Sequence, residues 1–393
     1  MSNKKLQSII ALCSMNFIVL ASSATSPALA SISVNFPDAS SVAVASIATL
    51  SCLTAVPFAI ISGLVVGKKI SFRKMSILGL LISALGGFMP YFSSTIAEIL
   101  VCRAILGIGT GLLGPIESTL TLSLFDDTDA AKQFGRNIMA RNFGAVIFQL
   151  AGGFLCNYNW RMPFVSYLII LPVVIIVLLC LPEPDKIVKK NAAIKQSKFS
   201  LREVLTPHVI FWSIVHALYM IVFYAYVTET SGIILNNGYG TAWTAAIVLS
   251  IFTASGVAGG YLFYPLSNKI KLKTFVVAFG LGAIGNFGLQ FAGDIVSYSL
   301  FSIIFGLGYG IIAPAINYYL GIKLKPEFRA SSYAVDNICC NFGSFCSPFI
   351  MTFIKSIFNH NNSDRFSFLV GTIFYVMVTV LFLTHKDRAE SII

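Results

Sequence analysis

Charged side chains are scarce in this sequence. Asp, Glu, Lys and Arg together make up 11% of its 393 residues, whereas hydrophobic residues make up 56%. Soluble globular domains carry about 25% charged residues, because their surfaces must be solvated. The composition therefore excludes an ordinary soluble protein and is typical of a chain that crosses a membrane many times.

The patterns that enzymes and metal sites use are also absent from the sequence. No H-E-x-x-H, Walker A or G-x-S-x-G motif occurs, and the eight cysteines have no C-x-x-C spacing. The four histidines form no ligand cluster; they are His208, His216, His360 and His385. We therefore expect no enzyme activity, no catalytic residue, no metal ion and no cofactor. Any active transport would draw on a proton gradient or another ion gradient.

Twelve apolar segments are long enough to span a bilayer, which takes about 20 residues of helix. They lie near 7–30, 42–66, 75–95, 97–123, 139–157, 162–181, 209–235, 242–266, 274–292, 296–320, 331–356 and 366–384. The first segment ends in Ala28-Leu29-Ala30 and so also resembles a cleaved signal peptide, but we interpret it as a membrane helix. We predict an all-α membrane protein with twelve transmembrane helices.

A basic segment divides these spans into six and six. The predicted domains are an N-terminal six-helix bundle at 1–182, a cytoplasmic linker at 183–208 and a C-terminal six-helix bundle at 209–393. If both termini are cytoplasmic, nearly all of the 27 Lys and Arg residues lie inside; the exceptions are Arg103, Arg161, Lys355 and Arg365. We predict a multi-pass protein of the cell (inner or plasma) membrane with this orientation.

With this orientation, the basic residues that give the net charge of +11 form a cytoplasmic rim that faces anionic lipid. It predicts no nucleic-acid partner. The expected partners are membrane lipid and a small-molecule substrate, and we expect a monomer.

An internal repeat relates the two halves at one constant offset. Gly107-x-Gly109-x-Gly111 matches Gly306-x-Gly308-x-Gly310, and both runs lie in the fourth span of their half. The same offset of 199 residues aligns Asn142-Phe143-Gly144 with Asn341-Phe342-Gly343. Duplicated halves around a central site are a transporter architecture.

Three motifs lie in the fourth, fifth and sixth spans. They are Leu100-Val-Cys-Arg103-Ala-Ile-Leu-Gly107-Ile-Gly109-Thr-Gly111, Gly144-x3-Phe148-Gln149-x2-Gly152-Gly153 and Asn159-Trp160-Arg161-Met-Pro163-Phe164. They resemble the motifs of the fourth, fifth and sixth helices of the major facilitator superfamily (MFS), in particular of its bacterial twelve-helix drug:proton antiporter branch. The Gly144 motif usually reads G-P at the Phe148-Gln149 position.

The resemblance implies the MFS fold of two pseudo-symmetric six-helix bundles and two sets of motif residues. Glycines for close helix contact would be Gly107, Gly111, Gly144, Gly152 and Gly153. A cytoplasmic gate would combine Gly63, Lys68 and Arg73 with Asp126 and Asp127. The loop that contains Lys68 departs from the family pattern, because Gly67 or Lys68 stands where the family usually has an Asp. Solvated loop charges are the alternative for the gate.

A few charged residues lie within apolar spans. At 100° per residue, Gly107 and Glu117 lie within about 40° of Arg103 on one helix face. A charge in a span usually faces the protein interior and is functional. The structural alternative is an ion pair with another helix. The predicted substrate cavity and coupling site combine Arg103, Glu117, Tyr219, Phe223, Tyr226 and Asn317.

Four residues are candidate proton carriers: Glu117, Glu229, Asp336 and His216. Glu229 and Asp336 could instead be solvated groups near span ends, and His216 a packing residue. The leading hypothesis is a secondary transporter that exports a small amphipathic or hydrophobic solute by alternating access in exchange for protons. The alternatives are an importer of a metabolite with the same fold, or a non-transporting sensor or membrane enzyme.

Overall fold

The computed structural model describes residues 3–67, 69–125, 127–182, 204–322, 324, 326–358 and 363–384. Within these ranges the chain is almost entirely helical, and eleven helical segments are long and apolar enough to cross a membrane. One of the eleven, Ala242–Phe291, consists of two helices joined at the short 3-10 helix η4 (Lys271–Lys273). The predicted all-α membrane fold with twelve spanning helices is therefore confirmed.

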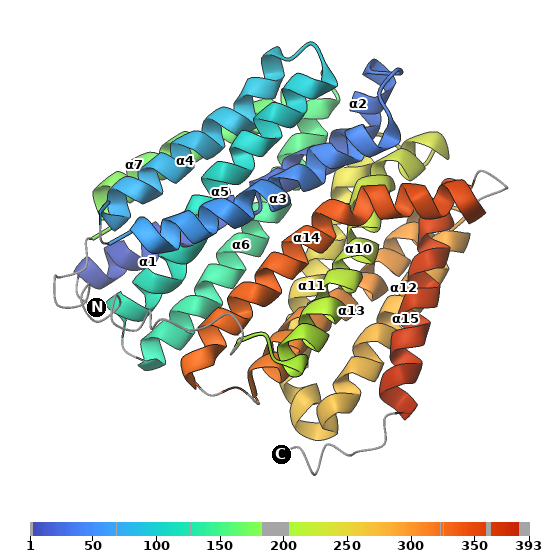
Figure 1. Cartoon of the computed structure of the whole chain (residues 1–393). Helices are drawn as coiled ribbons and strands as arrows, with labels where there is room; N and C mark the ends of the chain where they lie inside the picture. The colour runs from blue at the N-terminus through green and yellow to red at the C-terminus, as the bar shows by residue number, and fades with distance from the viewer. Residues whose placement is uncertain are drawn as a thin grey trace. The chain divides into compact units, whose positions relative to one another are not determined.

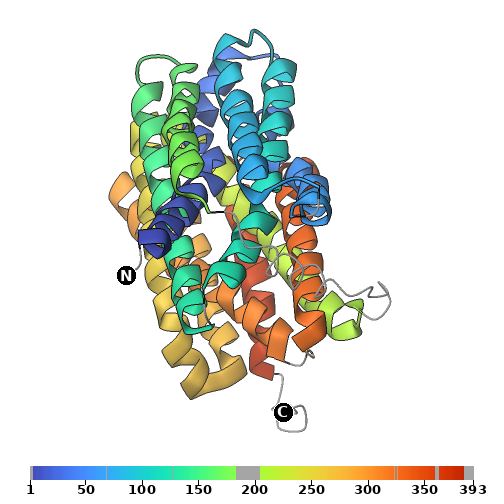
Figure 2. The ribbon, with the colours of Figure 1, turned by 90° about the vertical axis from the view of Figure 1, so that its left-hand side faces the viewer.

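The chain folds into two compact units, Met1–Lys198 and Phe199–Ile393. The helices of each unit run alongside one another as a bundle (Figures 1 and 2). Residues 183–203 of the predicted linker lie outside the described residues, so the domain limits 1–182 and 209–393 stay predictions.

The first span of the N-terminal unit is broken rather than continuous. Helix α1 (Asn3–Val19) leads into the 3-10 helix η1 (Ala21–Ala28) and then α2 (Leu29–Asn35). Pro27 has no N–H to donate, which favours the break. The other elements of this unit are α3 (Ser41–Val65), α4 (Phe72–Phe88), η2 (Met89–Phe92), α5 (Ile96–Leu124), α6 (Asp127–Cys156), η3 (Met162–Ile169) and α7 (Ile170–Cys180).

The C-terminal unit is built from longer, mostly unbroken helices around an aromatic core. Trp212, Phe275 and Phe279 are among the buried residues of this core. Stacking of such rings adds to the packing free energy that their buried area provides. The helices of this unit are α10 (Pro207–Asn236), α11 (Ala242–Ile270), α12 (Thr274–Phe291), α13 (Ile295–Ile322), α14 (Pro326–Phe358) and α15 (Phe366–Thr384).

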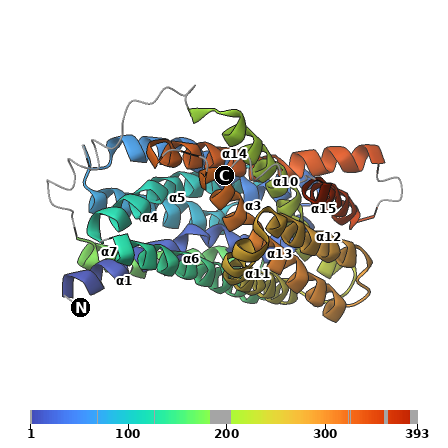
Figure 3. The same ribbon diagram turned by 90° about the horizontal axis from the view of Figure 1, so that it is seen from below.

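The sequence repeat is also a repeat of packing. A Cβ added at Gly107 of α5 would collide with Ser51 of α3, and a Cβ added at Gly306 of α13 would collide with Phe252 of α11. Likewise, Gly144 of α6 abuts the carbonyl of Phe17 in α1. Its counterpart Gly343 in α14 abuts the carbonyl of Ala217 in α10. Seen from below, α6 lies next to α1 (Figure 3).

One predicted helix boundary was wrong in a way that matters for function. The fifth span was expected from residue 139, but α6 begins at Asp127. Lys132 and Arg136, which precede the predicted span, therefore lie in the helix. Their charge lowered the local hydropathy and concealed the first turns of the helix.

Candidate functional site

Arg103 of α5 is fully buried inside the N-terminal unit. Its Nε donates to the carbonyl of Ile47 at 2.8 Å, and its Nη1 donates to the hydroxyl of Tyr167 at 2.6 Å. Nη2 reaches the carbonyl of Ser22 at 3.4 Å. The guanidinium thus joins the first, second and sixth spans to the fourth without a carboxylate. Its predicted role in a substrate cavity stays a prediction.

Glu117 lies further along α5 and belongs to a separate polar network with α6 and α1. Its two carboxylate oxygens accept from Asn137 Nδ2 at 2.8 Å and from Arg141 Nη2 at 3.0 Å. The same Nη2 donates to Asn16 Oδ1 at 3.1 Å. Arg103 and Glu117, predicted on one helix stripe, therefore bond to different partners.

His216 and Asp336 are brought together by the packing of α10 against α14. The imidazole Nδ1 lies 2.9 Å from Asp336 Oδ2, and the two residues are only 5% and 3% exposed. His216 Nε2 and Asp336 Oδ1 have no hydrogen-bond partner among the described residues. Ser213 and Ser332, one turn away on the same helices, also have buried hydroxyls without a partner there. Each such group costs about 1–3 kcal/mol.

Tyr219, Phe223 and Tyr226 of α10 lie within the aromatic core of the C-terminal unit. Phe223 stacks on Tyr309 with ring centroids 4.5 Å apart, and the ring of Tyr219 lies 6.2 Å from that of His216. The hydroxyls of Tyr219 and Tyr226 are buried without a partner among the described residues. Their predicted contact with substrate stays a prediction.

Asn317 and Glu229 lie apart from the His216–Asp336 couple. Asn317 of α13 is exposed, and its carbonyl accepts from the hydroxyl of Tyr333 at 3.1 Å. Glu229, near the C-terminal end of α10, pairs with Lys355 at 2.9 Å and accepts from Ser367 at 2.8 Å. Among the predicted carriers, Glu229 and Glu117 thus each have a basic side chain beside them.

The predicted cytoplasmic gate is described only in part. Lys68 and Asp126 lie outside the described residues, as does the side chain of Asp127. A Cβ added at Gly63 would lie at ordinary contact distance from Pro115, and Arg73 Nε donates to the carbonyl of Leu181 at 2.7 Å. The pairing that defines the gate therefore stays a prediction.

An ion pair joins the N-terminal ends of α1 and α6. Lys5 donates to Asp129, and this bond lowers the pKa of Asp129 from its ordinary value. The carboxylate therefore stays charged at neutral pH. The pair's contribution to stability is lost only as the pH falls through the lowered pKa.

The motif glycines bring helix backbones close together. A Cβ added at Gly111 would collide with the carbonyl of Ala55, and one added at Gly152 with that of Ala24. Gly153 is buried in the same helix as Gly152. Small residues at such contacts are typical of membrane helix packing.

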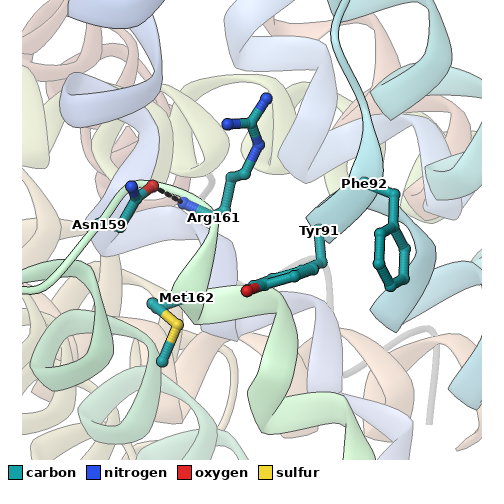
Figure 4. A pocket seen from close by; sticks show the side chains of 5 residues that line it. All are labelled: Tyr91, Phe92, Asn159, Arg161 and Met162. Carbon is teal, nitrogen blue, oxygen red and sulfur yellow. Dashed lines mark hydrogen bonds between the residues drawn. The ribbon is translucent and has the colours of Figure 1, made fainter.

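A surface pocket of about 360 Å³ lies between η2 and the start of η3. Tyr91, Phe92, Asn159, Arg161 and Met162 line it (Figure 4). The guanidinium of Arg161 lies 4.5 Å from the ring centre of Trp160, a cation–π contact. The pocket contains none of the residues predicted for the substrate cavity.

Sequence reasoning missed the partners of the predicted residues. Tyr167, Asn137 and Asn16 were not singled out, although each bonds to Arg103 or to the Glu117 network. Arg141 was counted among the cytoplasmic charges, although it lies within the predicted span 139–157. The spacing of Asn137, Arg141 and Gly144 at i, i+4 and i+7 was the signal that could have placed them on one helix face.

Twelve membrane helices, two units of matching packing and buried ionisable groups together define a polytopic membrane transporter. The chain belongs to the Major Facilitator Superfamily, whose family profile matches residues 11–348. The motif resemblance to that family is therefore confirmed.

Individual relatives add the fold and one short stretch of sequence similarity. The chain is 32% identical over 108 residues to a "Proton-coupled antiporter flippase LtaA" of Staphylococcus haemolyticus, a match that spans only 26% of each protein. It resembles the crystal structure of the nucleoside transporter NupG with a TM-score of 0.77 at 14% identity, covering 98% of this chain and 100% of that one.

Two further solved structures have the same fold. A bacterial homologue of the human lysosomal transporter Spinster, inward-facing and occupied, gives a TM-score of 0.77 at 14% identity, covering 98% of this chain and 97% of that one. The inward-open xylose transporter XylE from E. coli gives 0.71 at 15% identity, covering 98% and 96%. At such identities the likeness shows the fold and leaves the substrate open.

Proposed function

We propose that this protein exports a small amphipathic or hydrophobic solute by alternating access, in exchange for protons. It would work in the cell membrane with both termini cytoplasmic. The placement of the basic residues supports that orientation. The short match to a proton-coupled antiporter supports the coupling and the direction.

The observation that carries the coupling is the buried His216–Asp336 couple. His216 lies nine residues into α10, about 14 Å along the helix from Pro207. Ionisable groups at such depth are costly and are usually retained for function. A proton bound by the couple would neutralise the Asp336 carboxylate, and its release would restore the charge. Cys340 and Tyr219 are further titratable groups beside His216.

Uptake of a metabolite by the same fold is the second candidate. The solved relatives include a nucleoside transporter and a D-xylose–proton symporter. The couple would serve a symporter equally well, because gradients set the direction of a reversible cycle. A non-transporting sensor is the third candidate and predicts binding without flux.

The test is substrate-induced proton movement in proteoliposomes that contain a pH-sensitive dye. The panel would hold lipophilic cations, neutral drugs, organic acids, nucleosides and sugars. We expect at least one compound to move protons with the wild type. Asp336→Asn and His216→Gln should reduce that movement at least tenfold while retaining substrate exchange.

Serine-to-alanine replacement at the exposed Ser356 of α14 is the matched control. Proton movement that persists unchanged in Asp336→Asn would contradict the assignment of the couple. Exchange that is lost along with proton movement would point to a role in substrate binding instead.

A further inference from the structure

Arg141 is a partly exposed cation in the middle of a membrane span. It lies nine residues beyond Lys132, where the apolar span of α6 begins, and so about 14 Å into it. Its side chain is 35% exposed, whereas that of Glu117 beside it is 10% exposed. A guanidinium at this depth is too costly to face hydrocarbon, so its exposed part must face water or a ligand.

The hydrogen-bond acceptors around Arg141 are already occupied. Glu117 accepts from Asn137 and from Arg141, and Asn16 Oδ1 accepts from Arg141. Asn137 Oδ1 accepts from Gln133 Nε2 at 2.7 Å. A cationic ligand would therefore find Glu117 already paired and neutralised.

The donors of Arg141 are not all used. A guanidinium has five N–H groups, and the two bonds of Arg141 to described residues both come from Nη2. Nε is buried without a hydrogen-bond partner, and Nη1 has none among the described residues either. Arg141 thus has N–H groups left to donate to a ligand, and a negatively charged hydrogen-bond acceptor would suit them.

The internal repeat shows that Arg141 and the His216–Asp336 couple belong to different halves of the chain. At the offset of 199 residues, Asn137 corresponds to Asp336 and Arg141 corresponds to Cys340. The N-terminal unit therefore has a permanent cation at the repeat position equivalent to Cys340, one turn from the equivalent of Asp336. Substrate binding and proton binding can then use equivalent positions in different halves.

We propose that Arg141 binds the anionic group of an amphipathic monoanion, such as a carboxylate on an aromatic or aliphatic body. Nη1 donates to the ligand, and Glu117 competes with it for the same guanidinium. A single negative charge suits the site because Glu117 already balances part of the cation. The inference rests on the proposed transport function and names the substrate class of that transporter.

The test is binding of 2-naphthoate and of its neutral analogue 2-naphthamide to the purified protein in detergent, by calorimetry. Wild type should bind naphthoate at least about tenfold more tightly than naphthamide, because one ion pair distinguishes them. Arg141→Gln should abolish that preference, and Arg141→Lys should keep part of it. Glu117→Gln should tighten naphthoate binding by about tenfold, since it removes the competing carboxylate.

Lys132→Gln, which removes an exposed cation from the same helix, is the control and should leave both affinities unchanged. Melting curves of each variant establish that it is folded. The proposal is overturned if wild type shows no preference for naphthoate, or if folded Arg141→Gln keeps that preference. Proton movement driven by other compounds in proteoliposomes would then still support the transport function, so the two failures are distinguishable.

Discussion

At the scale of single residues, the sequence predicted some of the charges inside the membrane but not what they contact. Arg103 was identified because a cation interrupts an apolar span. Two of its three acceptors are the carbonyls of Ile47 and Ser22, which no side-chain pattern reveals. Arg141 was missed because it was counted with the cytoplasmic charges, although it lies within the predicted span 139–157. The pairing of His216 with Asp336 could not be derived from spacing, since 120 residues separate them.

We expect Arg103 to act chiefly by holding the N-terminal unit together. Removing its hydrogen bond to Tyr167 tests this expectation. Tyr167→Phe removes the acceptor of a buried, charge-assisted hydrogen bond, which should cost about 2 kcal/mol. The apparent melting temperature in detergent should fall by roughly 5 °C. Tyr158→Phe, at a residue that is 71% exposed, should leave it unchanged. Equal melting temperatures for the two variants would contradict the structural role.

At the scale of helices, hydropathy located every span but not the ends and breaks. The interruption at η1 depends on Pro27 within a run of small and hydroxyl residues, which the apolar average conceals. The early start of α6 depends on helix contacts that stabilise a charged first half, including the Lys5–Asp129 pair. Close approach of helices was better predicted, because the motif glycines mark it directly.

The contact of α6 with α1 provides a paired test on one helix. A Cβ at Gly144 would collide with the carbonyl of Phe17, so Gly144→Ala should force the helices apart and cost about 1–3 kcal/mol. Gly135 on the same helix has no atom within 4 Å of such a Cβ. Gly135→Ala should therefore be neutral or stabilising by up to about 1 kcal/mol. Melting curves would compare them, and a stable Gly144→Ala variant would refute the packing.

At the scale of the whole molecule, the internal repeat predicted more than any single motif. Blocks that match at one offset also pack alike in both units, as the contacts of Gly144 and Gly343 show. The repeat does not predict how the halves differ, because the differences arise from single residues that are not the same at equivalent positions of the two halves. Asn137 against Asp336 and Arg141 against Cys340 are such differences. They support a fixed cation in one unit and a proton site in the other.

Proton release on substrate binding tests the role of the His216–Asp336 couple most directly. It would be followed with a pH indicator, using the detergent-solubilised protein in weakly buffered solution. The wild type should release protons into solution as it binds substrate, since an exporter exchanges one for the other. Asp336→Asn should bind the same substrate with little or no release. Undiminished release from that variant would contradict the central claim that the His216–Asp336 couple carries the exchanged proton.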